Sequence, residues 1–116
     1  GMADERIDGA LVLADPITFS HRRRIADLAL QHRIPAVYGL REFADDGGLM
    51  SYWSEAATLY RRTAAYVDRI LRGAKVSELP IEQADVLELA VNLQTAQSLG
   101  LTIPQTALLQ TSQIVK

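Results

Sequence analysis

The chain has 116 residues, of which 48% are hydrophobic and 22% charged, ordinary values for one globular domain or a part of a larger protein. Its formal net charge of −2 leaves no broad basic field for a phosphate backbone, so nucleic-acid binding is disfavoured. It has no cysteine, which excludes disulfides and thiolate nucleophiles, and no apolar run long enough to span a membrane, so we expect no membrane insertion.

Residues 8–40 are predicted to form a β-α-β unit. Residues 10–14 are a short, continuous apolar run, typical of a strand that is covered on both faces in a parallel sheet. Asp15-Pro16 ends this strand, because proline cannot donate to the ladder. Apolar residues at helical spacing then predict an amphipathic helix over 20–32, with Thr18 or Ser20 as its N-cap, and 36–40 is a second buried strand. The unit favours a right-handed parallel crossover.

The middle of the chain is predicted to be a loop, a strand and a long helix. Residues 41–48 are polar and end in Gly47-Gly48, which indicates a flexible loop. A short strand over 49–52 follows. Ser54 is then expected to cap a helix over 55–72, and Gly73 stands where a helix commonly ends in a glycine.

The last third is predicted to contain return strands and short helices. Residues 81–92 hold two extended pieces, of which 86–91 is the stronger. A short helix over 95–99 is closed by Gly100, and Pro104 fits the first turn of a last helix over 104–110. Strands that alternate with helices place the chain in the α/β class.

Asp15 is a candidate ligand-binding residue because it follows the carboxyl end of a predicted parallel strand. In open α/β sheets ligands bind at that edge, and a carboxylate there can accept a hydrogen bond from a ligand amine or hydroxyl. The alternative is that Asp15 only caps the following turn. Tyr52 and Trp53 end the third predicted strand, where they could stack on a ligand or serve packing alone.

Other polar motifs favour no catalytic or metal site. His21 and His32 are eleven residues apart and do not share metal-ligand spacing. Ser20 next to His21 lacks the geometry of a nucleophile and its base, and no G-x-S-x-G motif is present. The basic run 22–24 is interpreted as a solvated face or as a contact for an anion or acidic partner, and Gly47-Gly48 does not match a phosphate-binding loop. We therefore expect no enzyme, no cofactor and no metal.

Many segments, in order, resemble the ABC-transporter substrate-binding protein family, in the branch that includes tryptophan/tyrosine transport components. The similarity covers nearly the whole chain and is carried by 10–16, 19–25, 33–39, 41–43, 47–52, 59–62, 66–75, 79–80 and 99–104.

The resemblance implies a partial periplasmic-binding-protein type I (Rossmann-like) lobe, similar to the C-terminal third of a two-lobed protein. Residues 8–52 would belong to the second lobe, 54–73 to a long helix on the first lobe, and 79–116 to return strands and C-terminal helices. The family binds solutes such as amino acids without catalysis, and its longer members work with an ABC permease.

By the same resemblance the candidate ligand-binding residues are Asp15, Arg41, Tyr52 and Trp53. Asp15 matches a loop that faces the ligand cleft, and Tyr52 matches the hinge side of it. Position 53 is commonly glycine in the family, so Trp53 would fill space near a ligand, and ligand binding by this truncated chain is an open expectation.

The long helix predicts self-association. Without a first lobe, its apolar side chains would stay in water, which is unfavourable. We expect a homodimer through the face formed by Leu59, Tyr66, Val67 and Ile70. The alternative to solute binding is then a stand-alone dimeric protein-interaction domain. No signal peptide is visible, so the chain as written is expected in the cytoplasm, whereas full-length relatives would be periplasmic or lipid-anchored.

Overall fold

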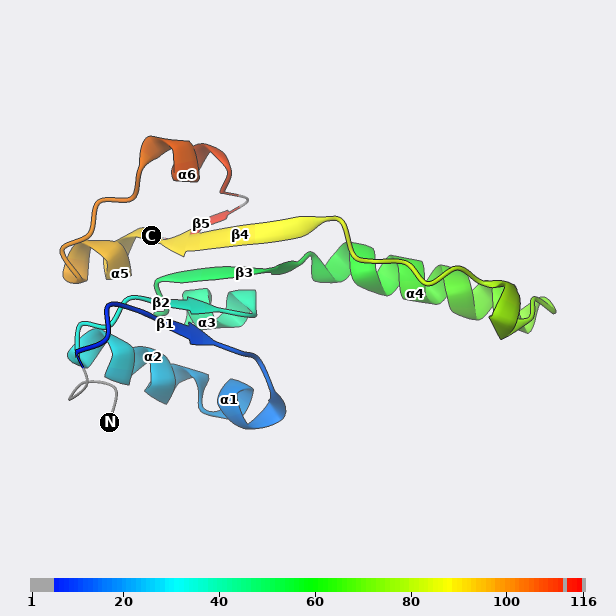
Figure 1. Cartoon of the computed structure of the whole chain (residues 1–116), viewed down its shortest axis with the longest axis horizontal. Coiled ribbons are helices and arrows are strands. Elements are labelled where there is room, and N and C mark those ends of the chain that lie inside the picture. Colours follow the sequence, from blue (N-terminus) through cyan, green and yellow to red (C-terminus); the bar gives the residue numbers. More distant parts are fainter. Residues whose placement is uncertain (1–5, 112, 116) are drawn as a thin grey trace. The chain divides into compact units, whose positions relative to one another are not determined.

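The computed structural model describes residues 6–111 and 113–115, and the chain divides into two compact units. Unit 1 holds the chain up to Trp53 and again from Glu88 onward, and unit 2 is the insertion Ser54–Leu87. The chain leaves unit 1 along one strand and returns to it along another (Figure 1).

Unit 1 is a five-stranded sheet with short helices. Its strand order follows the sequence, β1-β2-β3-β4-β5. The strands are β1 (Ala10–Val12), β2 (Ala36–Tyr38), β3 (Met50–Ser54), β4 (Leu87–Asn92) and β5 (Gln113–Val115). The helices are α1 (Pro16–Ser20), α2 (Arg22–Gln31), α3 (Arg41–Asp45), α5 (Leu93–Ser98) and α6 (Gln105–Leu109).

The sheet is mostly parallel. β1 pairs with β2, β2 with β3, and β4 with β5, each in parallel. β3 and β4 are antiparallel. Two hydrogen bonds show this: the Asn92 amide donates to the Leu49 carbonyl at 2.8 Å, and the Glu55 amide donates to the Val86 carbonyl at 2.8 Å. The return strand therefore lies beside the strand that led out.

The core of unit 1 lies where β2 meets the N-terminal helices. Tyr38 and Phe43 are 1% and 0% exposed, and their rings stack with centroids 4.9 Å apart. Phe19 of α1 and Ile25 of α2 pack against this cluster, so α1, α2 and α3 share one face of the sheet (Figure 1). Gly48 is required beside it, because an added Cβ would lie 2.7 Å from the Phe43 carbonyl oxygen and from Tyr38.

The C-terminal part of unit 1 is joined to α3 by buried polar groups. Asn92 caps α5 by accepting from the Thr95 amide, and its Nδ2 donates to the Ala44 carbonyl at 3.0 Å. The Thr95 hydroxyl donates to Gly47 at 2.8 Å. These bonds satisfy groups that would be costly to bury unpaired.

Unit 2 consists of α4 (Ala56–Leu71), the short turn η1 (Val76–Glu78) and an extended segment that leads to β4. Arg72 and Gly73 end α4, and Gly73 has φ +105°, the left-handed geometry that glycine tolerates. The Tyr66 hydroxyl donates to the Pro80 carbonyl at 2.6 Å, and Arg62 pairs with Asp85 at 2.8 Å. No residue of α4 is buried.

Several expected boundaries are wrong, and each has a local cause. The helix expected over 20–32 is present as α2, but its N-cap is His21 rather than Thr18 or Ser20. The sequence did not predict α1, which Asp15 caps and Pro16 begins. The flexible loop expected over 41–48 contains α3, which Phe43 fixes in the core. Glu55 rather than Ser54 precedes α4, and β5 had no prediction.

Candidate ligand-binding edge

Two of the four candidate residues, Asp15 and Arg41, lie beyond the carboxyl ends of β1 and β2, and the other two, Tyr52 and Trp53, lie near the carboxyl end of β3. The parallel register aligns Val12 with Tyr38, and Tyr38 with Ser51. Asp15 and Arg41 follow Val12 and Tyr38 by three residues each, and Tyr52 and Trp53 directly follow Ser51. The fold therefore brings all four candidates to one edge of the sheet, the edge at which α/β sheets bind ligands.

Asp15 is the N-cap of α1. Its Oδ1 accepts from the Thr18 amide at 2.8 Å, and the Thr18 hydroxyl accepts from the Asp15 amide at 2.9 Å. This is a capping box with threonine in the return position, which satisfies two amides that the helix itself leaves unpaired. Asp15 therefore does cap the following turn, which was the alternative to ligand binding. Because its side chain is exposed, the cap does not prevent a ligand from reaching the carboxylate.

The loops after β1 and β2 touch at this edge. An added Cβ on Gly39 would lie 3.3 Å from both the amide nitrogen and the Cβ of Ala14. That distance is tighter than ordinary van der Waals contact, so a larger residue at position 39 would push the Asp15 loop away. Gly39 is a positioning residue that the sequence pattern did not single out.

Arg41 begins α3 and is held by two carboxylates. Its Nε lies 3.4 Å from Asp45 Oδ2 and 3.8 Å from Glu88 Oε1, while about half of its side chain stays exposed. Glu88 comes from β4, far along the sequence, and Oε1 is buried without a hydrogen-bond donor. Sequence reasoning missed Glu88, because only the return of β4 beside β3 brings it to Arg41.

Tyr52 and Trp53 point to opposite faces of the sheet. Side chains alternate along a strand, and the two are 51% and 52% exposed. Trp53 shares its face with the buried Ser51, which is the face that carries α3. Tyr52 shares its face with Met50, and thus, through the register, with Leu11. The two rings therefore cannot stack on the same side of one ligand.

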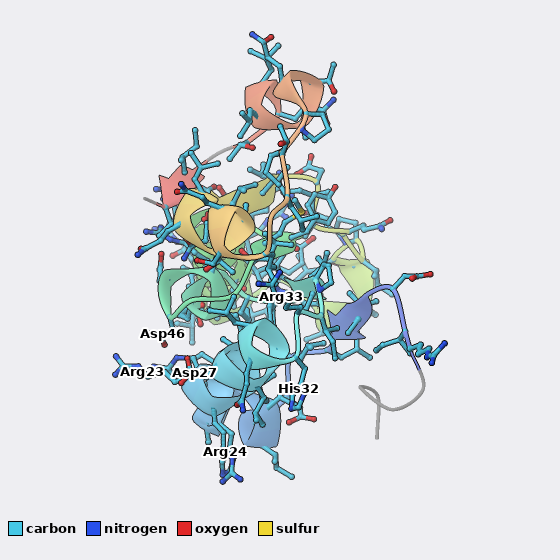
Figure 2. All side chains as sticks on the ribbon, turned by 90° about the vertical axis from the view of Figure 1, so that its left-hand side faces the viewer. Arg23, Arg24, Asp27, His32, Arg33 and Asp46 are labelled. Carbon is cyan, nitrogen blue, oxygen red and sulfur yellow. The ribbon has the colours of Figure 1, made fainter. Side chains whose placement is uncertain are left out.

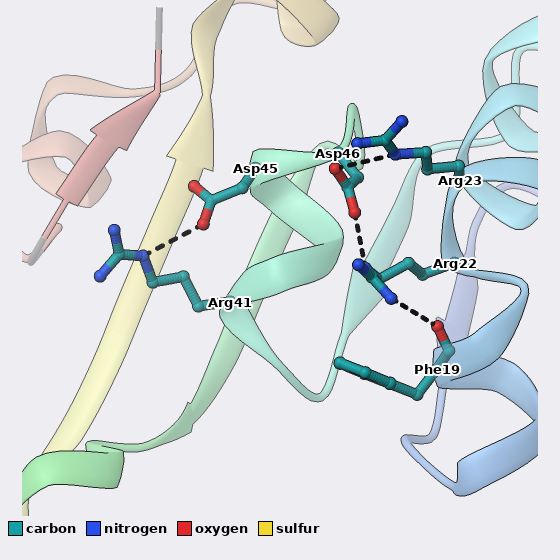
Figure 3. A network of polar contacts seen from close by, with 6 residues as sticks. All are labelled: Phe19, Arg22, Arg23, Arg41, Asp45 and Asp46. Atoms are coloured by element: carbon teal, nitrogen blue, oxygen red, sulfur yellow. Dashed lines mark hydrogen bonds and ion pairs between the residues drawn. The ribbon is translucent and has the colours of Figure 1, made fainter.

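The basic run 22–24 has a structural explanation. Asp46, with a side chain only 16% exposed, accepts from Arg22 Nε at 2.6 Å and from Arg23 Nε at 3.2 Å (Figure 3). The Arg22 guanidinium also donates to the Phe19 carbonyl and lies over the Phe19 ring at 4.5 Å. Figure 2 shows Arg23 and Arg24 pointing in different directions. Two of the three arginines thus tie α2 to the end of α3.

Metal ligation gains no support from the described residues. His21 Nδ1 lies 2.9 Å from the Ile17 carbonyl within α1, and His32 stands at the end of α2. Within the ranges 6–111 and 113–115, no group of three histidine or acidic side chains could hold a metal ion. In the same ranges no helix has both the length and the apolarity to cross a bilayer.

A comparison with protein families identifies the family of this chain. The family model described as ABC transporter substrate binding protein matches residues 2–115. The chain belongs to this family. Substrate-binding proteins of this family are generally non-catalytic. Among curated proteins no relative matches the chain.

Three solved structures share the fold of this chain. A conserved domain protein from Vibrio cholerae O1 biovar El Tor aligns with 97% of the chain at TM-score 0.87 and 25% identity. A Streptococcus pneumoniae ABC domain solved with L-Trp aligns with 98% of it at TM-score 0.85 and 24% identity. A Clostridium difficile substrate-binding protein with adhesive properties, in its ligand-free open form, aligns with 99% at TM-score 0.72 and 22% identity.

The alignments also measure how much of the fold is present. The chain covers 38%, 39% and 38% of these three neighbours, so it spans well under half of their length. The predicted fold class, a partial periplasmic-binding-type α/β lobe with a mostly parallel sheet, is confirmed.

Proposed function

We propose that the chain is a non-catalytic solute-binding component related to ABC-type uptake of amino acids or similar small molecules. One observation carries this proposal: in a chain of this family, Asp15, Arg41, Tyr52 and Trp53 gather at the carboxyl edge of parallel strands. That edge offers a carboxylate, a guanidinium and aromatic rings, which suit the charged and apolar parts of an amino acid.

The proposed division of labour follows the lobes of the family. Residues 8–52, of the second lobe, supply one wall of a ligand cleft, 54–73 form a long helix of the first lobe, and 79–116 form return strands and C-terminal helices. An ABC permease is a partner only for a full-length relative. No acid, base and nucleophile come together at the edge, which supports a binding rather than a catalytic role.

A thermal-shift titration with the twenty amino acids tests ligand binding. A ligand at a hundred times its Kd adds about 2.7 kcal/mol to the stability of the folded state. We expect a shift with an aromatic amino acid, since the neighbour from S. pneumoniae was solved with L-Trp. Tyr52→Ala and Trp53→Ala then show which face binds, because the two rings lie on opposite faces. No shift with any amino acid contradicts retained binding.

A second candidate function is a stand-alone dimeric interaction domain, and the exposed apolar face of α4 favours it. Leu59, Val67 and Ile70 are 42%, 50% and 41% exposed. Tyr66 completes the face, and its hydroxyl pKa is raised by desolvation and by the nearby Glu82 carboxylate. We propose that a second copy of the chain covers this face. Light scattering of the purified chain at micromolar concentration tests it: a dimer is expected, and a monomer refutes it.

A further inference from the structure

One half of the α4 surface carries no charge. With 3.6 residues per turn, each residue advances the helix by 100°, and the uncharged half spans about 180° of the circumference. The charged side chains Arg61, Arg62, Asp68 and Arg69 all lie on the other half. The uncharged half holds apolar or small residues: Ala56, Ala57, Leu59, Tyr60, Thr63, Ala64, Tyr66, Val67, Ile70 and Leu71.

This half contains two stripes with different surroundings. Leu59, Tyr66 and Ile70 line a cavity of about 420 Å³ whose other wall is the unit's own segment around Leu79 and Pro80. The outer stripe, defined as Tyr60, Ala64, Val67 and Leu71, does not line it. Its three large side chains are 73%, 50% and 82% exposed. Unit 2 therefore covers the first stripe in part and leaves the outer stripe in solvent.

We infer that the outer stripe packs against the outer stripe of a second copy, with the two α4 helices antiparallel. This inference rests on the self-association proposed above, and it moves the contact from the face named there to the outer stripe, which shares only Val67 with that face. The four residues are spaced by four, three and four positions, so the pattern is the same in both chain directions. An antiparallel two-fold pair then sets Tyr60 against Leu71 of the other copy, and Ala64 against Val67.

Three features select another copy of α4 as the occupant. The outer stripe has room for one helix only, because the neighbouring stripe of Leu59, Tyr66 and Ile70 already faces the 76–84 segment of the same unit. It has no charge, so two identical surfaces meet without like-charge repulsion. Ala64 near its centre permits close approach of two helices, and a two-fold contact must be self-complementary, which the symmetric spacing supplies.

Charged substitutions on the stripe test the surface. Leu71→Lys and Val67→Lys replace exposed side chains, and a lysine in the last turn of α4 is compatible with the helix dipole, so folding is expected to persist. Each should raise the dimer dissociation constant about tenfold or more in light scattering. The matched control is Leu109→Lys on α6, which is 79% exposed and should leave the dimer unchanged.

Engineered cysteines test the antiparallel register, since the natural chain has none. Ala64→Cys and Val67→Cys chains carrying different tags are mixed and treated with a short thiol cross-linker. Mixed cross-linked pairs should exceed the Ala64–Ala64 pair by severalfold. Preferential Ala64–Ala64 linkage would indicate parallel helices and overturn the proposed register.

The outcomes separate this inference from the proposals on which it rests. A wild-type monomer overturns self-association and the stripe together. A dimer that survives both lysine substitutions overturns only the outer stripe and returns the contact to the Leu59, Tyr66 and Ile70 groove. Neither result bears on amino-acid binding, which the thermal-shift titration measures separately.

Discussion

Unit 1 and unit 2 differ in how many of their side chains are buried. In unit 1, Tyr38, Phe43 and Val91 are at most 1% exposed, and strands far apart in sequence lie side by side. In unit 2 the longest helix of the described chain has no buried residue. The comparison teaches that a strong helical pattern predicts the helix but says nothing of how much of its apolar face the chain itself covers.

The polar contacts of the two units show the same difference. The Asp46 carboxylate of unit 1 is 16% exposed and receives two arginines, whereas Asp68 and Arg72 of unit 2 form an i,i+4 pair with side chains 59% and 80% exposed. Water screens the second pair far more than the first. Stability should therefore respond to substitutions in unit 1 and hardly to those in unit 2.

The largest expected effect is that of Phe43→Ala. Removing a fully buried ring that stacks on Tyr38 should lower the free energy of unfolding by about 3–5 kcal/mol, because a cavity stays behind. Urea denaturation followed by circular dichroism measures the loss. The control Leu109→Ala, on an exposed residue of α6, should change it little. If Phe43→Ala lowered the free energy of unfolding by less than about 1 kcal/mol, unit 1 would depend on its buried side chains no more than unit 2 does.

Asp46→Asn should have the next largest effect. Two arginines from α2 lose their charged acceptor, and we expect a loss of about 1–2 kcal/mol in the same denaturation experiment. Arg23 is largely exposed, which keeps the figure at the lower end. Asp68→Asn is the matched control in α4 and should cost about 0.3–0.5 kcal/mol. Equal costs at both positions would contradict the comparison.

Two substitutions at Asp15 separate its cap from its proposed ligand contact. Asp15→Ala should cost about 1 kcal/mol of stability, because α1 loses its N-cap. Asp15→Asn keeps an oxygen that caps equally well and should leave stability almost unchanged. If the carboxylate binds a ligand amine, Asp15→Asn still weakens the thermal shift with that ligand. A full shift in Asp15→Asn would reduce Asp15 to its structural role.

The sequence predicted elements that local pattern controls. The apolar run at β1, the helical spacing of α4 and the turn at Gly73 are each visible within a few residues, and each is present. α3 was missed because its five residues are polar apart from Phe43 and Ala44, and the helix is fixed by burial of those two side chains in a core that other segments build.

The residues at the candidate edge also divide into those that the sequence could propose and those that it could not. Asp15, Tyr52 and Trp53 stand at the ends of predicted strands, so sequence order sufficed to propose them, and the family resemblance added Arg41. Glu88 could not be proposed, because its contact with Arg41 depends on β4 pairing antiparallel to β3. The opposite faces of Tyr52 and Trp53 follow from strand alternation, once β3 extends through both residues rather than ending at position 52.

The smallest expected effect is that of Leu71→Ala in unit 2. The side chain is 82% exposed, so its removal should change the stability of the monomeric chain by less than about 0.5 kcal/mol, at a protein concentration well below the dimer dissociation constant. At high concentration the same variant should lose stability relative to the natural chain, because dimerisation stabilises only a chain that keeps its contact. Thermal unfolding at the two concentrations measures both values. If Leu71→Ala loses stability only at high concentration, Leu71 is buried by the partner copy. If it loses the same stability at both concentrations, unit 2 buries Leu71 by itself.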